Sequence, residues 1–586
     1  MIFCDAHLHI AQVGRLADFT AYPPEGGTNR ADCRWYACTC SHTPQEFLAT
    51  EALLSAAGRQ SSPGRILLAF GLHPQAPRLE HAAFLEQLAQ EGRIQAVGEA
   101  GFDLFTPEYR ALLPAPVAEE EECILEQESW TNADIAAAIS QACARRKAPY
   151  AVFAWADCPF LNLSLTGELV RILTEYKAEY SFADGFAYGL GPEVIDGGTA
   201  GIIATLGKDS QKAAGSRRAE RDALFAIMSG DINSFEIETH IADKDYRLLR
   251  LSFDCGSKAT ALGCSRLYQA AKAGGVDMAD LYALSDLAEK SAPVLQTLPA
   301  FFNVQIAGSY KHRYAYVPED LPSPSDMDAD SFSALVKDLA SVNPRAVVSL
   351  SLFGEPLLHP RFADCVEQVL GYPELSLFIE TDGTLVTPEL AARLSALDGG
   401  RGAERMTWCL LLDAVDGAMY GAVHGISDGD RAAADFAAAC RGVEVLASCF
   451  PHHVYPQFTR MKANEAQLET FYRYWKKSDS PSQGELIIQK YDRFCGKLPD
   501  AKSADLSPLN RFPCWHLRRD LCILSDGSVP FCRSAAFSGS CDKAGNVLKE
   551  GVEAVWERFR GPLEEQIQQS YNEMCKVCDE YYTFNF

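Results

Sequence analysis

The sequence has no apolar run approaching the 18 or more residues that cross a bilayer. Its first ten residues, MIFCDAHLHI, lack the basic stretch of a secretory signal and carry charge where that signal is apolar. Positive charge is also scarce, because 53 Lys and Arg stand against 78 Asp and Glu, a net charge of −25. This balance argues against a chain-wide electrostatic grip on nucleic acid. We therefore expect a cytoplasmic protein with no membrane span.

Cysteine is missing from one long stretch and concentrated in another. None of the 20 cysteines lies between Cys264 and Cys365, whereas six lie in the last 73 residues, from Cys514 onward. In a reducing compartment such a local cluster indicates metal ligation rather than disulfides. The scattered cysteines are expected to be small buried apolar side chains.

With 586 residues, 47% of them apolar, the chain is long enough for about three or four domains. Short apolar strands alternate with helical patterns through most of it, which predicts an α/β, multidomain protein. The expected regions are a partial TIM-type (βα) segment at 1–115, an acidic linker at 116–128, a second α/β segment at 129–295, a partial (β/α) barrel at 296–505 and a cysteine-rich tail at 506–586.

Candidate metal ligands follow three predicted strands of the first region. His7 and His9 alternate on one face of the strand MIFCDAHLHI, so their imidazoles can converge on one ion. His73 ends the strand RILLAFGLHP, and Glu99 follows in IQAVGEAGFD. The ends of the strands of a βα barrel point to one mouth, so these side chains are expected to meet there.

These motifs resemble those of the TatD family of metal-dependent hydrolases, D-x-H-x-H, G-x-H-P and G-E-x-G-x-D. The resemblance implies a divalent ion held by His7, His9 and Glu99, with His73 a weaker candidate and Glu99 and Asp103 as catalytic carboxylates. It covers about the first 105 residues, three βα units of eight, and the later ligands of the family have no match. We expect a truncated segment with an incomplete metal site.

Asp157 stands at the end of the strand APYAVFAWAD in the second α/β segment. It resembles the metal-binding carboxylate of nucleotidyltransferases with a GT-A-like fold, which holds the ion on the nucleotide phosphates. The first strand and glycine-rich loop of that family are missing, so this region is interpreted as truncated. The alternative is that Asp157 caps a turn.

The segments LFGEPLLHP and IETDGTL resemble motifs of the radical S-adenosylmethionine (SAM) enzymes. The resemblance implies a partial barrel in which Gly354 and Glu355 belong to a weak S-adenosylmethionine-like site. In that family a C-x3-C-x2-C triad after the first strand binds the cluster, but here Ser309, Arg313 and Tyr316 have that spacing. Neither a hydroxyl nor a guanidinium replaces a thiolate on iron. Radical formation from S-adenosylmethionine is therefore not expected.

The tail contains four thiols whose order suggests one metal centre. Cys514 opens it, a predicted turn at Asp526-Gly527 returns the chain to Cys532, and a predicted helix GVEAVWERF precedes the chelating pair Cys575 and Cys578. This arrangement resembles the SPASM/Twitch tail, which implies an auxiliary [4Fe-4S] cluster on those four cysteines. A structural Cys4 zinc site is the alternative.

Barrel and tail together resemble the spiro-SPASM proteins, over about residues 130–586. The resemblance implies an iron–sulfur protein with a degenerate radical-SAM-like barrel, acting in peptide or protein maturation or as a redox or docking scaffold. The alternative function is a TatD-type phosphoesterase or deoxyribonuclease, the only case in which nucleic acid would be a partner. A non-catalytic binding scaffold or an artificial fusion also stays open, as do the substrate and the oligomeric state.

Overall fold

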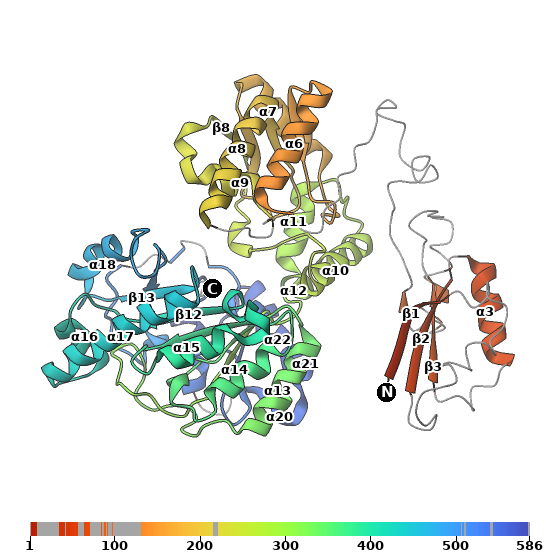
Figure 1. Ribbon diagram of the computed structural model, residues 1–586. Helices are drawn as coiled ribbons and strands as arrows, with labels where there is room; N and C mark the ends of the chain where they lie inside the picture. Colours follow the sequence, from red (N-terminus) through yellow and green to blue (C-terminus); the bar gives the residue numbers. More distant parts are fainter. Residues whose placement is uncertain are drawn as a thin grey trace. The chain divides into compact units, whose positions relative to one another are not determined.

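A computed structural model of the chain (Figure 1) describes residues 2–8, 34–41, 43–56, 64–70, 84, 87, 88, 91, 96, 97, 130–214, 219, 221–504, 507–508, 511–538 and 543–583. The chain divides into two compact units, Met1–Ile124 and Leu125–Phe586. Within the described residues, no helix combines the length and the apolar character that a bilayer crossing requires.

The first unit contains a parallel four-stranded sheet in the order β1-β2-β3-β4. Strands β1 and β4 fall within predicted strand segments, β3 begins one residue before its segment, and β2 is a further strand paired between β1 and β3. Parallel neighbours require crossover connections, as βα units provide. The bounds are β1 (Ile2–Leu8), β2 (Arg34–Ser41), α3 (Pro44–Ala56), β3 (Gly64–Phe70) and β4 (Ala96–Val97).

The amino-terminal part of the second unit has a mixed sheet in the order β5-β7-β6-β8. Strand β7 is antiparallel to both neighbours, and β8 is parallel to β6. The bounds are α6 (Asn132–Arg146), β5 (Tyr150–Phe153), α7 (Leu163–Tyr176), β6 (Tyr180–Asp184), β7 (Glu193–Asp196), α8 (Gly197–Ala214), α9 (Ala223–Met228), β8 (Ile237–Ile241), α10 (Lys258–Gly274), α11 (Leu281–Lys290) and α12 (Ala292–Leu295).

A seven-stranded parallel sheet, curled into a partial barrel, follows with the order β14-β13-β12-β11-β10-β9-β15. This confirms the α/β, multidomain class. The bounds are β9 (Phe301–Val304), α13 (Ala329–Val342), β10 (Val347–Ser349), α14 (Phe362–Leu370), β11 (Ser376–Thr381), α15 (Pro388–Ser395), β12 (Met406–Leu411), α16 (Gly417–His424), α17 (Gly429–Cys449), β13 (Val454–Arg460), α18 (Leu468–Trp475), β14 (Ile487–Lys490) and the 3₁₀ turn η8 (Phe494–Gly496).

The two faces of this sheet differ in chemistry. On β11, Leu377 and Ile379 are buried in the large core between the sheet and its helices. The alternate residues, Phe378 and Glu380, line a cavity on the inner face. Successive side chains of a strand point to opposite faces, so one strand serves both the core and the cavity.

The seventh strand, β15, comes from the predicted tail. It pairs in parallel with β9, with Cys522 opposite Asn303. The chain then turns at Asp526-Gly527, as predicted, and the N–H of Leu524 donates to the carbonyl of Ser528 at 2.9 Å. The bounds in the tail are α19 (His516–Arg519), β15 (Asp520–Ile523), β16 (Ser528–Pro530), β17 (Lys543–Asn546), α20 (Val547–Glu550), α21 (Val552–Glu557), α22 (Arg560–Ile567) and α23 (Glu573–Val577).

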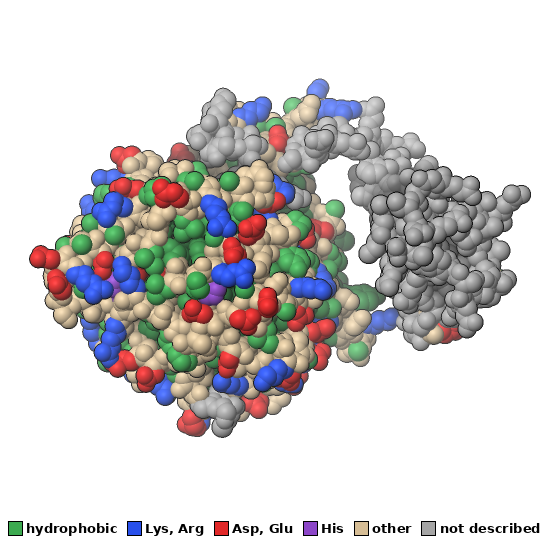
Figure 2. Space-filling view, turned by 60° about the horizontal axis from the view of Figure 1, so that its bottom comes forward, with side chains coloured by type: hydrophobic (Ala, Val, Ile, Leu, Met, Phe, Trp, Pro, Cys, Tyr) green, Lys and Arg blue, Asp and Glu red, His purple; other side chains and the backbone are tan. Residues whose placement is uncertain are grey.

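The surface is mixed in charge. On the face that Figure 2 shows, Lys and Arg side chains are interspersed with Asp and Glu over the described residues. That face therefore offers no broad positive field of the kind that holds a polyanion.

Candidate functional site

A cavity of about 310 Å³ lies between the inner face of the seven-stranded sheet and the tail. The sheet lines it with polar side chains from neighbouring strands, Asn303 of β9, Ser349 of β10, Glu380 of β11 and Gln457 of β13. The buried amide oxygen of Asn303 has no hydrogen-bond partner among the described residues. The inside of a βα barrel is ordinarily filled by branched apolar side chains, so this inner face is built to receive something polar.

Gly354 and Glu355, the residues predicted to contact a cofactor, line this cavity. Gly354 has φ +82, and a Cβ there would lie 2.2 Å from the carbonyl oxygen of Ala307, so a larger residue does not fit. The Glu355 carboxylate accepts hydrogen bonds from the Thr381 hydroxyl at 2.8 Å and the Asp382 N–H at 3.0 Å. Burial, with the neighbouring charge of Asp382, raises the pKa of Glu355 to about 8. Glu355 therefore fixes the end of β11 at the rim of the cavity.

The four predicted tail cysteines line the same cavity from the opposite side. Cys514 precedes α19, Cys532 follows β16, and the pair Cys575 and Cys578 lies on and just after α23. The Asn572 side chain caps α23 by accepting the N–H of Cys575 at 2.7 Å, which fixes the start of that short helix. Three separate segments thus bring their thiols to one place.

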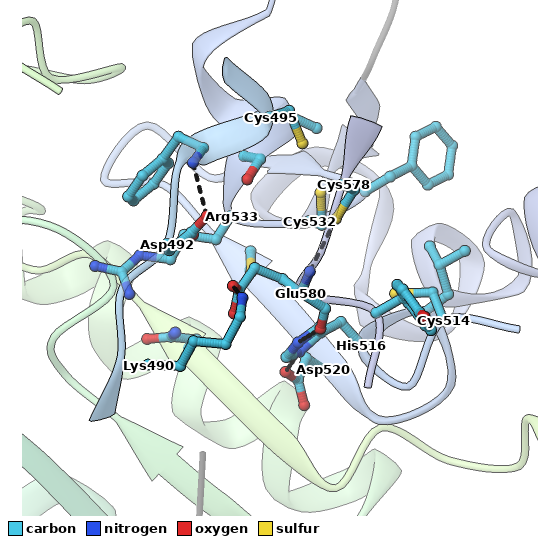
Figure 3. A pocket seen from close by; sticks show the side chains of 18 of the residues that line it. Lys490, Asp492, Cys495, Cys514, His516, Asp520, Cys532, Arg533, Cys578 and Glu580 are labelled. Carbon is cyan, nitrogen blue, oxygen red and sulfur yellow. Dashed lines mark hydrogen bonds and ion pairs between the residues drawn. The ribbon is translucent and has the colours of Figure 1, made fainter. Parts of the chain in front are cut away.

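Two further cysteines, Cys522 of β15 and Cys495, also line the cavity, and Cys495 was not predicted from the sequence. It lies in the 3₁₀ turn η8, after β14. Figure 3 shows its sulfur together with those of Cys532 and Cys578. Cys495 lies outside the C-x2-C spacing, so no motif marks it. Its only signal in the sequence is that it is the cysteine nearest to the tail cluster.

N–H groups point at the sulfurs of the chelating pair. The backbone N–H of Glu580 donates to the sulfur of Cys578 at 3.4 Å, and the Gln566 side-chain amide donates to that of Cys575 at 3.6 Å. The amide oxygen of Gln566 accepts the N–H of Cys514 at 2.8 Å, so this buried glutamine joins two of the cysteine segments.

The other two thiols have backbone N–H groups nearby. Burial has the largest effect on the pKa of these thiols and raises it, whereas the N–H groups of Leu517 and His516 near Cys514, and of Ala535 near Cys532, lower it. The donors follow their cysteine by two or three residues, where the chain turns back on itself. Hydrogen bonds of this kind favour the thiolate.

Burial acts in the opposite direction. It is the largest cause that raises the pKa of Cys514, to about 12, and it raises that of Cys532 well above the ordinary value. The pKa of Cys578 is raised first by its hydrogen bond with Cys495 and then by burial. The donors favour the thiolate form, while burial disfavours its charge.

The spacing of the thiols bears on the kind of metal. Around a tetrahedral zinc, with Zn–S distances near 2.3 Å, four sulfurs lie roughly 3.8 Å from one another. Within the described part of the chain, no three cysteine sulfurs lie within 4.8 Å of one another. Thiolates of an iron–sulfur cluster bind different irons and are held farther apart.

One set of carboxylates near the thiols is close enough to share an ion: Asp492, Asp579 and Glu580. Lys490 pairs with Asp579 and Glu580, and Lys502 pairs with Asp579. These lysines already balance the acidic group, so we assign it no metal.

The loop between β9 and α13 holds the positions where the radical SAM family has its cysteine triad. Ser309 and Arg313 are exposed, and Arg313 forms an ion pair with Glu319. Tyr316 is buried, and its hydroxyl donates to Asp413 at 2.8 Å. The three positions therefore do not converge on one point.

Aromatic packing holds this loop in place. The ring centroids of Tyr310 and Tyr314 are 5.3 Å apart, as are those of Tyr314 and Tyr316. His312 has a side chain that is 1% exposed, and its Nε2 lies 3.3 Å from Asp382 Oδ2, without a hydrogen bond from that nitrogen to any described residue. The loop is part of the protein core.

Asp157 lies apart from this cavity, and its two oxygens each accept a hydrogen bond from Arg221 at 2.6 Å. The same guanidinium lies 3.3 Å from Asp254. These hydrogen bonds lower the pKa of Asp157. A cationic side chain thus lies where the nucleotidyltransferase resemblance puts an ion, and the metal role of Asp157 stays a prediction.

The candidate site of the first unit is only partly accessible to structural description. His7 belongs to β1, whereas His9, His73, Glu99 and Asp103 lie outside the described residues. A divalent-metal site there, and hydrolysis by it, stay predictions.

No family model matches the chain. It is 37% identical over 375 residues to an uncharacterized protein of Treponema pallidum (strain Nichols), covering 62% of this chain and 98% of that protein. A second uncharacterized protein of the same strain is 44% identical over 63 residues, 11% of this chain and 29% of that protein. Most of the 375 matched residues must lie in the second unit, because the first has only 124.

Solved structures with a similar course of the chain include BtrN in complex with AdoMet and 2-DOIA, with 14% identity, a TM-score of 0.31 and coverage of 48% of this chain and 94% of that chain. Native anSMEcpe with bound AdoMet has 15% identity, a TM-score of 0.35 and coverage of 48% and 87%. Streptococcus suis SuiB bound to precursor peptide SuiA has 12% identity, a TM-score of 0.37 and coverage of 57% and 86%. Likenesses this distant assign no function, which must come from the residues themselves.

Proposed function

The chain belongs to the family of the Treponema pallidum protein that it matches over 98% of that protein's length, and from the geometry of its second unit we propose that it is an iron–sulfur protein. Cys514, Cys532, Cys575 and Cys578 bind a [4Fe-4S] cluster at the edge of the cavity. The barrel acts as a docking site beside the cluster and forms no radical.

One observation carries the proposal: thiols from three segments line one cavity, and the sulfurs of Cys575 and Cys578 accept hydrogen bonds from the Gln566 side-chain amide and the Glu580 N–H. Buried neutral thiols that pack as apolar groups have no need of such donors. Hydrogen bonds to ligand sulfur are a usual feature of iron–sulfur sites, where they orient the ligands and tune the cluster. The four cysteines therefore fit the group.

Charge around the site supports the same assignment. Arg518 is 5% exposed, and its guanidinium donates to the carbonyls of Leu295 and Leu249 and has no carboxylate partner in the described residues. Burial lowers the pKa of Arg518 to about 9, and the negative charge of Cys514 opposes this effect. A buried cation is stabilised by a neighbouring negative centre, and four thiolates around a cluster leave a net negative charge.

The loop after β9 supports a barrel that does not form radicals. Two of its three triad positions, Ser309 and Arg313, are exposed, and the third, Tyr316, is a buried hydrogen-bonded tyrosine. None supplies a thiolate to iron. The polar inner face, with Asn303 and Glu380, stays available for a ligand.

When bound, the cluster supplies one-electron transfer. The residues of the chain hold it, exclude water from its inner side and keep it next to the ligand cavity. Since the tail resembles SPASM tails, we propose a peptide or protein as the docked partner. Zinc remains the alternative for the same four ligands.

The test is metal analysis of the full-length protein, purified without oxygen. We expect a brown protein with about four irons and four acid-labile sulfides per chain. Cys514→Ser, Cys532→Ser, Cys575→Ser and Cys578→Ser should each lose most of this iron, whereas Cys449→Ser, a thiol outside the cavity, should keep it. A colourless protein with one zinc per chain would overturn the cluster but keep its ligands, and a metal-free protein would overturn both.

A further inference from the structure

Arg533 lies on the tail side of the cavity and directly follows the proposed cluster ligand Cys532. Aromatic rings hold its guanidinium, whose carbon is 5.2 Å from the ring centroid of Phe494 and 5.6 Å from that of Phe353. Both rings are buried, and each packs edge-on against Phe537. The rings therefore fix the guanidinium through cation–π contacts, which use none of its N–H groups.

The N–H groups of Arg533 have no acceptor among the described residues. Its Nε is buried without a hydrogen-bond partner, and its guanidinium forms no ion pair or hydrogen bond within the described part of the chain. By contrast, the buried guanidinium of Arg518 donates to two backbone carbonyls. A guanidinium keeps its charge when it leaves bulk water, and its five N–H groups then need acceptors. Arg533 is therefore suited to an anion that the chain itself does not supply.

Hydrogen-bond acceptors line the same cavity. The amide oxygen of Asn303 is buried and has no hydrogen-bond partner in the described residues. The carboxylate of Glu380 also lines the cavity, and it forms no ion pair or hydrogen bond with any residue that the structure describes. Such acceptors suit the N–H groups of a peptide, whereas Arg533 suits a carboxylate. Together they fit a ligand that carries both kinds of group.

Two carboxyl groups of the cavity, those of Glu380 and Asp492, oppose an incoming anion less than ordinary carboxylates would. Burial raises the pKa of Glu380 and raises that of Asp492 to about 7. Their neutral forms are therefore more populated than at a protein surface, while the guanidinium of Arg533 stays charged. Figure 3 shows the Arg533 side chain on the Asp492 side of the cavity, away from the sulfurs of Cys532 and Cys578. The guanidinium is thus placed for a ligand of the cavity rather than for the cluster.

We propose that Arg533 binds a carboxylate of the docked peptide, with two N–H groups donating to the two oxygens. The inference rests on the proposed function, because it names the group by which the docked partner is recognised. Paired hydrogen bonds between a guanidinium and a carboxylate are strong and directional. Asn303 and Glu380 accept N–H groups of the same peptide. The cavity of about 310 Å³ is small for a ligand pocket, so it takes the carboxyl end of a peptide or one acidic side chain.

The test uses full-length protein purified without oxygen and two isomeric probes. N-acetylglutamine has a terminal carboxylate, and N-acetylglutamic acid α-amide has its carboxylate on the side chain. N-acetylglutaminamide, which is uncharged, is the matched control compound. At constant ionic strength, we expect at least one acid to raise the melting temperature of wild type with increasing concentration, and the diamide to have no effect. The acid that stabilises the protein identifies the source of the carboxylate.

Variants connect this binding to Arg533. Arg533→Gln should bind the stabilising acid at least ~10-fold more weakly, and Arg533→Lys, which keeps the charge without the planar fork, should lie between. Arg473→Gln removes an exposed guanidinium outside the cavity and should bind as wild type does. Without probe, Arg533→Met should melt no lower than wild type, because the rings of Phe353 and Phe494 provide an apolar surrounding.

Iron is measured in every sample, which separates this inference from the proposed function. Stabilisation of wild type by neither acid, equal stabilisation by the diamide, or an unchanged affinity of Arg533→Gln would each overturn the carboxylate site, even at full iron content. A lower melting temperature of Arg533→Met at full iron content would show that the guanidinium supports the fold instead. A wild type that binds the acid but holds no iron would overturn the cluster and support the carboxylate site.

Discussion

Two regions border the same cavity, and both resemble parts of radical SAM enzymes. They differ in their candidate metal ligands, which the tail has and the loop after β9 lacks. In the loop after β9, the triad positions are filled by Ser309, Arg313 and Tyr316, which point apart into solvent and core. In the tail, four thiols from distant segments line one cavity, and N–H groups donate to two of them, Cys575 and Cys578. The comparison teaches that a metal site needs both ligand side chains and N–H groups that donate to them. The loop has neither.

The largest expected effect comes from trying to make the loop like the tail. A Ser309→Cys/Arg313→Cys/Tyr316→Cys variant removes a buried ring and its hydrogen bond to Asp413, so we expect it to lose roughly 3–5 kcal/mol of unfolding free energy. Its iron content per chain should not rise. Denaturant unfolding and iron analysis check this, with Ser309→Cys/Arg313→Cys as the control, since both of those positions are exposed. A second cluster in the triple variant would contradict the comparison.

Substitution of Gly354, at the rim of the cavity, should also destabilise the protein. In Gly354→Ala, the new methyl group meets the carbonyl oxygen of Ala307 in a backbone conformation that L-residues resist. We expect a loss of about 3 kcal/mol of unfolding free energy, measured by chemical denaturation. Gly429→Ala, where no atom lies within 4 Å of the new Cβ, is the control and should change stability little. Equal stability of the two variants would count against this reading of the rim.

On the tail side, the residue to test is Gln566, which joins Cys514 and Cys575. Gln566→Leu leaves the buried N–H of Cys514 without its acceptor, at a cost of about 1–3 kcal/mol. We expect slower metal incorporation as well as a lower melting temperature. The exposed neighbour Gln568→Leu should behave as wild type. Identical melting of the two variants would mean that the donors around the thiols contribute nothing.

The smallest effect is a pH dependence on the barrel side. The pKa of Glu355 is raised to about 8, so its protonated form is the one that the fold prefers. Its stabilising contribution is complete below its ordinary pKa and is lost as the pH rises through about 8. Wild type should therefore lose melting temperature between pH 6 and pH 9 relative to Glu355→Gln, which cannot ionise. Parallel melting profiles over that range would contradict the raised pKa.

Local sequence patterns predict much of the fold. Alternation of apolar residues on the strands and the βα repetition predict the sheet, because side-chain direction along a strand depends only on neighbours in sequence. The turn at Asp526-Gly527 is local in the same way. The pairing of β15 with β9 was not foreseen, because it joins residues more than 200 positions apart that carry no shared motif.

Some residues of the candidate site could likewise be predicted from the sequence, and others could not. Cys575 and Cys578 are visible through their spacing, and Cys514 and Cys532 through the resemblance that links them. Cys495 could not be found, because its place beside the cavity depends on a left-handed turn that no motif in the sequence marks. For the same reason, sequence patterns gave no hint that Arg221 lies against Asp157.

The pairing of β15 with β9 has a consequence for synthesis of the chain on the ribosome. β9 begins at Phe301, and the strand that covers its edge begins only at Asp520. Until then, the growing polypeptide carries a sheet with an unpaired margin of N–H and C=O groups, the kind of margin that invites association with other chains. The barrel cannot close early, and a chain released before residue 520 would be a natural substrate for chaperones.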